Sequence, residues 1–160
     1  MVFFCPACWK ELPGDLNFCP HCYAQISSWS ENTFVEKLLQ ALSHPEPLTQ
    51  IRAVYVLGEK KIAEAVPALT VLFRRSKDLF LQSEIVEAMG KIGSEAAISL
   101  LLKALCHPSF IVRGEAARSL GKIPRNSVVK GALNKALKDP SSYVREIRQK
   151  ALEIAGAEED

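Results

Sequence analysis

The sequence has no apolar run long enough to cross a membrane. The longest candidate, from Ala96 to Cys106, is interrupted by Ser99 and Lys103, whereas a membrane-spanning helix needs about 18 apolar residues. The apolar start of the chain stops at Cys5 with no basic segment before it, which is unlike a secretory signal. We therefore expect a cytoplasmic protein that makes no membrane contact.

A surplus of charge is also missing. Lys and Arg together number 20 and Asp and Glu number 18, so the net charge is only +2. Such a balance does not by itself indicate nucleic acid or a membrane surface as the partner. Hydrophobic residues make up 48% and charged residues 24% of the 160 positions, values that exclude wholesale disorder and predict one or two compact domains.

Cysteine is scarce in most of the chain, but two pairs lie near its start, Cys5 with Cys8 and Cys19 with Cys22. Clustered thiols in a reducing compartment favour metal binding over disulfides. A two-residue gap lets both sulfurs of a pair reach one ion, and two pairs complete the tetrahedral set of structural zinc sites. We predict one structural Zn²⁺ held by these four cysteines, which would leave no open position for catalysis. Two disulfides, or iron in place of zinc, are the alternatives.

This segment resembles the short zinc-ribbon family. The resemblance covers about 25 residues and is carried by Phe4-Cys5-Pro6-Ala7-Cys8, Glu11-Leu12-Pro13 and Phe18-Cys19-Pro20-His21-Cys22. It implies a ribbon over residues 1–27 with short β-hairpin elements. Residues 28–32 are polar apart from Trp29, which predicts a short linker. The family usually has Gly after the second Cys of each pair, because the backbone there tends toward positive φ. Trp9 and Tyr23 occupy these positions here, so we expect slight strain at both.

Self-similarity organises residues 33–157. Three segments end in a glycine at the same place, Gly58, Gly90 and Gly121, and a fourth follows in register with Glu153 instead. These positions are almost equally spaced, and a constant period of about 32 residues indicates one helix pair (A then B) per repeat, stacked on its neighbours. We predict an all-α solenoid of four pairs at about 33–60, 63–92, 94–123 and 126–155, with an acidic tail at 158–160.

The repeats resemble the HEAT repeat, in particular the short form called PBS-lyase HEAT-like. Residues 112–123 and 139–145 carry the resemblance, which spans about 125 residues. In that family the position of Arg113 and Arg145 belongs to an internal hydrogen-bonding ladder with a turn Asp, here Asp139. The alternative is that these arginines grip a phosphate or carboxylate. Repeat 2 departs from the pattern, with Gln82 in the Arg position.

The fourth repeat is polar where a further repeat would stack. Arg148 replaces the small or apolar residues of the earlier repeats, and Glu153 replaces glycine. A terminal repeat needs a polar outer face. We therefore predict that the fourth repeat caps the solenoid.

The B helices are expected to line the inner face of the stack and to present a mixed surface with acidic residues in its middle. A groove that tracks phosphates would be basic throughout, whereas mixed charge with an occasional Tyr or Ile suits a polypeptide. The residues predicted to be exposed there and to contact a partner are Arg52, Tyr55, Glu84, Glu87, Glu115, Arg118, Ile147 and Lys150.

These features predict a non-enzymatic scaffold for protein–protein interaction. Nucleic-acid binding is the alternative, since residues 97–157 hold eleven Lys and Arg against four acids. A third hypothesis, an accessory or lyase-like role in cofactor attachment, rests on the resemblance alone. HEAT-like metal hydroxylases hold iron with His-Glu pairs, and none of the three histidines here precedes Glu. Cys106 lies among Leu102, Leu105 and Phe110, so we expect a core thiol and not a nucleophile.

Overall fold

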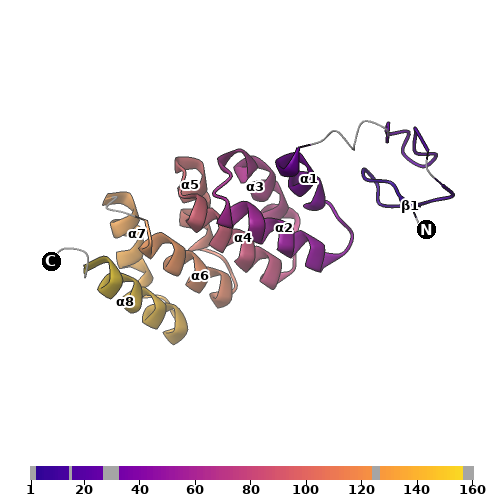
Figure 1. The fold of residues 1–160 in the computed structure, drawn as a ribbon. Helices are drawn as coiled ribbons and strands as arrows, with labels where there is room; N and C mark the ends of the chain where they lie inside the picture. The colour runs from indigo at the N-terminus through magenta and orange to yellow at the C-terminus, as the bar shows by residue number, and fades with distance from the viewer. Residues whose placement is uncertain (1–2, 15, 27–32, 124–126, 157–160) are drawn as a thin grey trace. The chain divides into compact units, whose positions relative to one another are not determined.

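The structure is a computed structural model that describes residues 3–14, 16–26, 33–123 and 127–156 (Figure 1). The chain divides into two compact units, residues 1–53 and 54–160. The predicted linker over 28–32 and the acidic tail over 158–160 lie outside the described residues. No described helix is both long enough and apolar enough to span a bilayer.

The described residues form eight α-helices, as the repeat pattern predicts. They are α1 Phe34–Ala41, α2 Pro47–Glu59, α3 Val66–Arg75, α4 Leu79–Ile92, α5 Glu95–Ala104, α6 Phe110–Gly121, α7 Ser127–Ala136 and α8 Ser142–Gly156, with a 3₁₀ turn, η2, at Ala63–Ala65 before α3. Each odd-numbered helix is the A helix of a pair and each even-numbered helix is its B helix. The all-α solenoid of four helix pairs is confirmed.

The N-terminal segment contains two very short pairs of extended backbone. Strand β1 (Phe3–Phe4) lies antiparallel to β2 (Glu11–Leu12), and Phe18 forms an isolated antiparallel bridge with Gln25. The small core between them consists of Cys5, Leu12 and Cys19, with Cys8 and Ile26 packed against it. Most of these side chains are cysteines, so apolar burial alone gives the segment little stability.

Helix α1 begins where the sequence predicts it. The Thr33 hydroxyl accepts a hydrogen bond from the backbone N–H of Glu36 (3.2 Å), and the Glu36 carboxylate accepts one from the backbone N–H of Thr33 (2.6 Å). This reciprocal capping box satisfies N–H groups that have no partner inside the helix.

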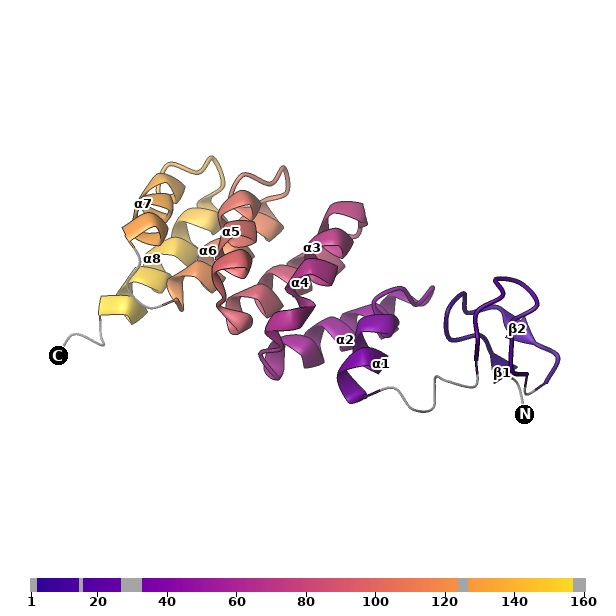
Figure 2. The same cartoon turned by 90° about the horizontal axis from the view of Figure 1, so that it is seen from above.

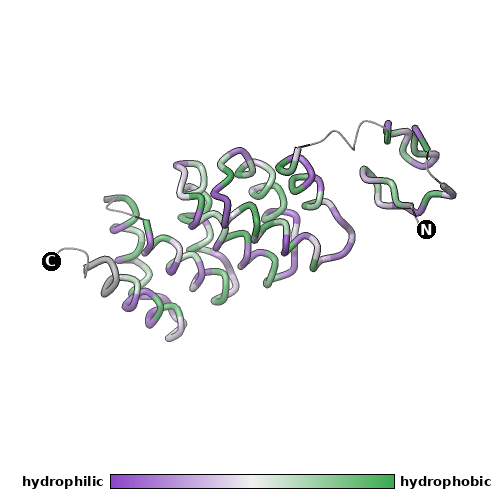
Figure 3. The backbone as a smooth tube through the Cα atoms, in the orientation of Figure 1, coloured by the Kyte–Doolittle hydropathy of each residue, from purple (hydrophilic) through white to green (hydrophobic). Residues whose placement is uncertain are grey.

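The second unit is built in two layers. The A helices α3, α5 and α7 form one layer and the B helices α4, α6 and α8 form the other (Figures 1 and 2). Hydrophobic residues recur along each helix between hydrophilic ones (Figure 3), the pattern of amphipathic helices. Six of the largest fully buried side chains belong to this core, Leu57, Leu69, Ile85, Met89, Leu101 and Leu120.

The repeat glycines allow neighbouring B helices to touch. A Cβ atom on Gly58 would lie 2.8 Å from the Cα and Cβ of Ala88, and one on Gly90 would lie 2.6 Å from the Cβ of Ser119. A Cβ on Gly121 would collide with Ala151 in the same way. Each repeat glycine therefore faces a small residue of the next repeat, and the regular spacing of these glycines in the sequence marks the backbone contacts.

Each repeat also closes its A–B turn with the same hydrogen bond. A long polar side chain in the first turns of the B helix donates to the carbonyl oxygen six residues earlier. The four bonds run from Gln50 to His44 (2.6 Å), from Gln82 to Ser76 (2.9 Å), from Arg113 to His107 (2.9 Å) and from Arg145 to Asp139 (2.7 Å). Gln82 thus makes the same turn contact as the arginines, although it departs from the family pattern.

The residue whose carbonyl oxygen accepts this bond makes a second contact through its side chain. The side chain accepts a hydrogen bond from the backbone N–H group two residues later. The acceptor atoms, each followed by the residue whose N–H donates to it, are His44 Nδ1 with Glu46 (2.9 Å), Ser76 Oγ with Asp78 (3.1 Å), His107 Nδ1 with Ser109 (3.1 Å) and Asp139 Oδ1 with Ser141 (2.9 Å). We call the two contacts together the turn clip. Two of the three histidines of the chain therefore act as turn residues, in the manner of Asp or Ser.

Arg113 adds a contact between repeats. Its Nε and Nη2 atoms donate to the two carboxylate oxygens of Asp139 at 2.7 and 2.9 Å. The Arg113 guanidinium holds the pKa of the Asp139 carboxyl below its usual range. The predicted ladder between this arginine and the turn Asp is confirmed, and bidentate geometry of this kind is among the stronger side-chain contacts.

Arg148 contradicts the prediction that it belongs to a solvent-facing cap. It is only 5% exposed, and it donates to the backbone oxygen of Leu133 (3.1 Å) and to the side-chain oxygen of Asn134 (2.6 Å). The physical reason is that the end of α7 leaves carbonyl groups without helical partners, and a long guanidinium side chain can reach them. The side chain of Glu153 lies outside the described residues.

Candidate metal centre and B-helix surface

The four predicted metal ligands converge. The sulfur atoms of Cys5, Cys8, Cys19 and Cys22 all lie within 4.8 Å of one another, and two of the distances, Cys5 to Cys22 and Cys8 to Cys19, are 3.7 Å. Tetrahedral sulfur ligands at the usual zinc distance of about 2.3 Å lie about 3.8 Å apart, so the donor set fits a tetrahedral ion. A disulfide requires about 2.05 Å between sulfurs, and all four thiols are free.

Two equivalent backbone turns hold these ligands. Cys5 and Cys19 each accept a hydrogen bond at their sulfur from the N–H two residues later, from Ala7 and from His21, both at 3.4 Å. Burial raises the pKa of the Cys19 thiol, but hydrogen bonds from backbone N–H groups lower this pKa by more than burial raises it. The resulting pKa is about 6. The second turn therefore favours the thiolate of Cys19, the form that binds metals. The His21 side chain is exposed and is not part of the cysteine cluster.

The residue after each cysteine pair has the left-handed backbone that the resemblance implies. Trp9 has φ 62° and Tyr23 has φ 58°. Their N–H groups donate to the carbonyl oxygens of Cys5 (2.8 Å) and Cys19 (2.9 Å), closing the turns. A left-handed conformation costs a residue with a side chain about 1–2 kcal/mol. The expected strain at both positions is confirmed.

The predicted partner residues differ in accessibility. Arg52 and Lys150 are exposed, Tyr55 is 50% exposed, and Glu84, Glu87, Arg118 and Ile147 are partly buried. Glu115 contradicts the prediction that it is exposed, since only 7% of its surface is accessible. The reason is its place on α6, the middle B helix of the second unit, which packs between α4 and α8.

Glu84, Glu87 and Glu115 form an acidic centre on this surface. Burial raises the pKa of Glu84, and repulsion from Glu87 and Glu115 adds to the effect. Burial also raises the pKa of Glu115, although the nearby Arg118 opposes the shift. Arg118 donates to Oε2 of Glu115 at 2.5 Å, while the buried Oε1 has no hydrogen-bond partner among the described residues. The centre therefore has more negative charge than its neighbours balance.

Lys91 and Glu59 are residues of this surface that the sequence reasoning missed. The Lys91 ammonium group contacts the carboxylates of Glu59 (2.8 Å) and Glu87 (2.7 Å) and lies 5.0 Å from the ring centre of Tyr55. Burial lowers the pKa of Lys91, but the bonds to Glu59 and Glu87 raise it more. Both missed residues directly follow a repeat glycine and lie four positions after a predicted surface residue, and this spacing could have identified them.

Two pockets lie in the A-helix layer. One, of about 400 Å³, is lined by residues of α3 and α5, and the other, of about 410 Å³, lies mainly between α5 and α7. Cys106 lines the second pocket and is exposed. The expectation of a core thiol is therefore wrong, because α5 ends at Ala104 and Cys106 belongs to the turn that follows.

Comparison with known proteins relates the chain to helical-repeat enzymes. Deoxyhypusine hydroxylase-B of rice (Oryza sativa subsp. japonica) is 42% identical over 72 residues, which are 42% of this chain and 23% of the rice protein. The structure of human deoxyhypusine hydroxylase in complex with glycerol matches 79% of this chain, with a TM-score of 0.65 at 29% identity. This chain spans 45% of the human protein.

A second solved structure shares the fold. The complex of CpcE and CpcF of phycocyanin lyase from Nostoc sp. PCC7120 has a TM-score of 0.65 at 24% identity. The match covers 91% of this chain and 59% of the chain from the complex.

These relatives contradict the prediction that the chain is not an enzyme, because the rice and human proteins are hydroxylases by name. The absence of His-Glu pairs concerns one kind of iron site and therefore could not exclude an enzymatic role. The family pattern of HEAT repeats matches residues 35–121 and 81–153. Since these ranges cover well over half of the sequence, the chain belongs to the HEAT-repeat family.

Proposed function

We propose that the repeat domain, residues 33–157, binds a polypeptide on its B-helix surface and that the ribbon, residues 1–27, is folded around one structural Zn²⁺. The observation that carries the first part is the acidic centre of Glu84, Glu87 and Glu115, whose charge the described residues only partly balance. A Lys or Arg side chain of a partner would supply the missing cation. The half-exposed Tyr55 ring offers apolar contact area beside it.

The contacts of the arginines favour a polypeptide over nucleic acid. Arg113 and Arg145 are held by the turn clips and Arg148 is buried in the fourth repeat. Two of the eleven basic residues between 97 and 157 are therefore committed to the fold, Arg113 through both oxygens of Asp139 and Arg148 through burial, whereas Arg145 is exposed and uses only Nη1 in its turn clip. The excess of positive charge that suggested nucleic acid is correspondingly smaller at the surface.

A second proposal concerns the reaction in which this binding takes place. The 42% identity to a rice deoxyhypusine hydroxylase over 72 residues supports a role in enzymatic modification, with the bound polypeptide as the substrate. Incubation of the purified chain with a protein that contains deoxyhypusine, followed by mass spectrometry of that residue, tests this role. A lyase-like role in cofactor attachment rests on the shared fold alone.

Zinc is the metal that we propose for the four cysteines. Four thiolates in a closed tetrahedral arrangement suit zinc, and iron is the alternative for the same set. Free thiols at this density are typical of a reducing compartment, so we place the protein in the cytoplasm. Elemental analysis of the purified protein should find one zinc per chain.

Charge reversal tests the binding surface. The double variant Glu84→Lys with Glu87→Lys should abolish capture of protein partners from the native host. Glu64→Lys, which makes the same type of change at an exposed turn residue, is the control and should retain capture. Both variants should keep the helical circular dichroism of the wild type. Equal loss of capture in both would exclude the acidic centre as the binding site.

Nucleic acid is tested on the same proteins. If the basic residues bind phosphates, affinity for a labelled oligonucleotide should fall steeply with salt, with a log–log slope of about −0.7 to −0.9 per contact. Replacing Arg118, Lys122 and Lys150 with Gln should then flatten the slope. Tight oligonucleotide binding at physiological salt that these replacements remove would favour the nucleic-acid alternative over the polypeptide.

A further inference from the structure

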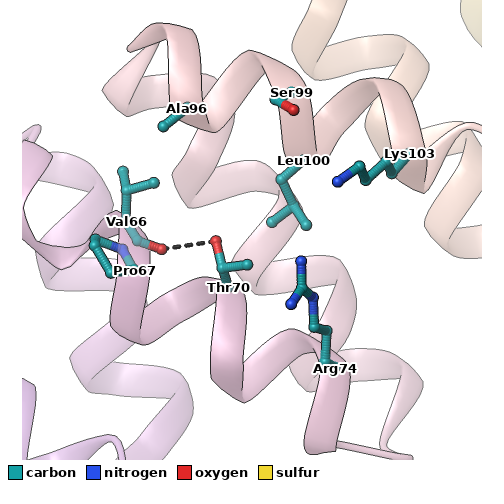
Figure 4. A pocket seen from close by; sticks show the side chains of 8 residues that line it. All are labelled: Val66, Pro67, Thr70, Arg74, Ala96, Ser99, Leu100 and Lys103. Carbon is teal, nitrogen blue, oxygen red and sulfur yellow. Dashed lines mark hydrogen bonds between the residues drawn. The ribbon is translucent and has the colours of Figure 1, made fainter.

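The A-helix layer contains a groove with apolar walls and two cations at one end. Val66, Pro67 and Thr70 of α3 face Ala96, Ser99 and Leu100 of α5 across it (Figure 4). Its volume of about 400 Å³ falls within the usual range of ligand pockets, about 300–1,000 Å³. The groove belongs to the layer opposite the B helices, so it is separate from the surface proposed above.

The two cations come from different helices and meet at the same end. Arg74 lies in the last turn of α3 and Lys103 in the last turn of α5. Figure 4 shows both charged groups directed toward the space beside Leu100. Neither makes an ion pair with any residue that the structure describes. The groove therefore has two positive charges available at one end.

No described residue that lines the groove is acidic. α3 contains no acidic residue, and the one acid of α5, Glu95, lies in its first turn. Eight residues of helix separate Glu95 from Lys103, about 12 Å at 1.5 Å per residue. The polarity of the groove is thus fixed, with its positive end at the C-terminal ends of the two helices. An occupant should place its carboxylates there.

Thr70 offers the groove no unengaged hydroxyl hydrogen. The Thr70 hydroxyl donates to the Val66 carbonyl oxygen at 2.8 Å, so its hydrogen is already committed. The remaining walls are mostly aliphatic, which suits apolar side chains of an occupant. None of the described residues that line the groove is aromatic, so it lacks the stacking partners that single-stranded nucleic acid uses.

We propose that this groove docks an acidic amphipathic segment of a partner protein, with aliphatic side chains between α3 and α5 and carboxylates on Arg74 and Lys103. Charge complementarity selects the occupant, because apolar walls with cations at one end match a segment that is apolar along one side and acidic at one end. Such a segment is a second point of attachment, independent of the B-helix surface.

Fluorescence anisotropy with three labelled helical peptides tests the proposal on the full chain. The peptides share the same leucine spacing and carry Glu, Gln or Lys at every polar position. The Glu peptide should bind more tightly than about 1 mM, and the Gln peptide about fivefold more weakly, as expected for the loss of two exposed charge pairs. The Lys peptide should not bind. Amide resonances of Thr70 and Ser99 should shift on addition of the Glu peptide.

Three variants separate the groove from general electrostatics. Arg74→Glu and Ala96→Trp should each weaken binding of the Glu peptide at least fivefold, the first by reversing a cation and the second by filling the groove from an exposed position. Arg75→Glu is the matched control. It makes the same charge change one residue later, at a position that does not line the groove, and should change affinity less than about twofold.

Four results would overturn the proposal. The first two are equal affinity for the Glu and Gln peptides, and equal loss of affinity for the Glu peptide in Arg75→Glu and Arg74→Glu. The third is absence of binding by the Glu peptide up to about 1 mM. The fourth is displacement of that peptide by a single-stranded oligonucleotide that shifts the same amide resonances. Binding of polypeptide to the B-helix surface is measured separately with the Glu84→Lys and Glu87→Lys variant, so either proposal can fail alone.

Discussion

Replacement of Gly90 by alanine tests whether the repeat glycines exist for contact between helices. Alanine raises helix propensity by about 1 kcal/mol over glycine, so an isolated helix would be stabilised. In the protein, the new Cβ would lie 2.6 Å from the Ser119 Cβ and 3.2 Å from its Cα. Both atoms are fixed to the backbone of α6, so α4 and α6 must separate. Overpacking of this kind costs about 1–3 kcal/mol.

Gly131→Ala is the matched control. Gly131 also lies within a helix, α7, but a Cβ at this position would meet no described atom within 4 Å. Only the propensity gain remains, so this variant should be more stable than the wild type by about 0.5–1 kcal/mol. The same chemical change is thus predicted to have opposite signs at two helical glycines.

Urea unfolding followed by circular dichroism measures both effects. Gly90→Ala should lower the free energy of unfolding by up to about 2 kcal/mol, because the propensity gain of about 1 kcal/mol offsets part of the overpacking cost. Adding Ser119→Gly should recover part of the loss, because the atom that the new Cβ meets is removed. If Gly90→Ala were stabilised as much as Gly131→Ala, the close contact between α4 and α6 would be refuted.

Four further predictions concern the ribbon, the pair of Arg113 and Asp139, and the core. Removal of the metal by a chelator should unfold the ribbon and leave most of the helical circular dichroism signal intact, and loss of that signal would contradict an independently folded repeat domain. Elemental analysis of the Cys5→Ser variant should find no bound metal. Trp9→Gly should stabilise the ribbon by about 1 kcal/mol, seen as slower metal loss to a chelator; faster loss would show that the indole packing matters more than the φ angle. Asp139→Asn should lower the free energy of unfolding by about 1–3 kcal/mol at pH 7. Because the pKa of Asp139 is depressed in the folded protein, the wild type should lose this advantage over the variant as pH falls below about 4. An advantage that persists in acid would contradict the ion pair between Arg113 and Asp139. Leu120→Ala should cost about 2–5 kcal/mol in urea unfolding, and a cost below about 1 kcal/mol would show that Leu120 is not in the core.

The periodic features of this chain could be predicted from its sequence because they follow local rules. The cysteine spacing predicts the cluster of sulfurs, and the resemblance to the zinc-ribbon family implies positive φ at positions 9 and 23. The period of Gly58, Gly90 and Gly121 locates the first three B helices, and its continuation at Glu153 locates the fourth. These features depend on residues close in sequence or repeated at a fixed interval.

The errors concern residues whose surroundings come from distant parts of the chain. The pattern predicts Glu115 at the surface, but α4 and α8 pack on both sides of its helix. It predicts that Arg148 faces solvent, but this side chain is buried because it donates a hydrogen bond to the Leu133 carbonyl oxygen near the end of α7. It predicts Cys106 in the core, although this residue lies just beyond the end of α5 and lines an open pocket. Periodicity assigns a face to each residue but not the depth of its burial.

The turn clip has a consequence for the rate of folding. Each of its bonds joins residues two or six positions apart, as between Arg113 and His107 or between Gln82 and Ser76. Such contacts lose little loop entropy when they form, and chains rich in local contacts fold quickly. Every repeat can therefore close its own helical hairpin before it meets a neighbour, and folding can start at any of the four repeats. A replacement such as Gln82→Ala should slow folding, and an unchanged folding rate with faster unfolding would show that the clip closes only after the transition state.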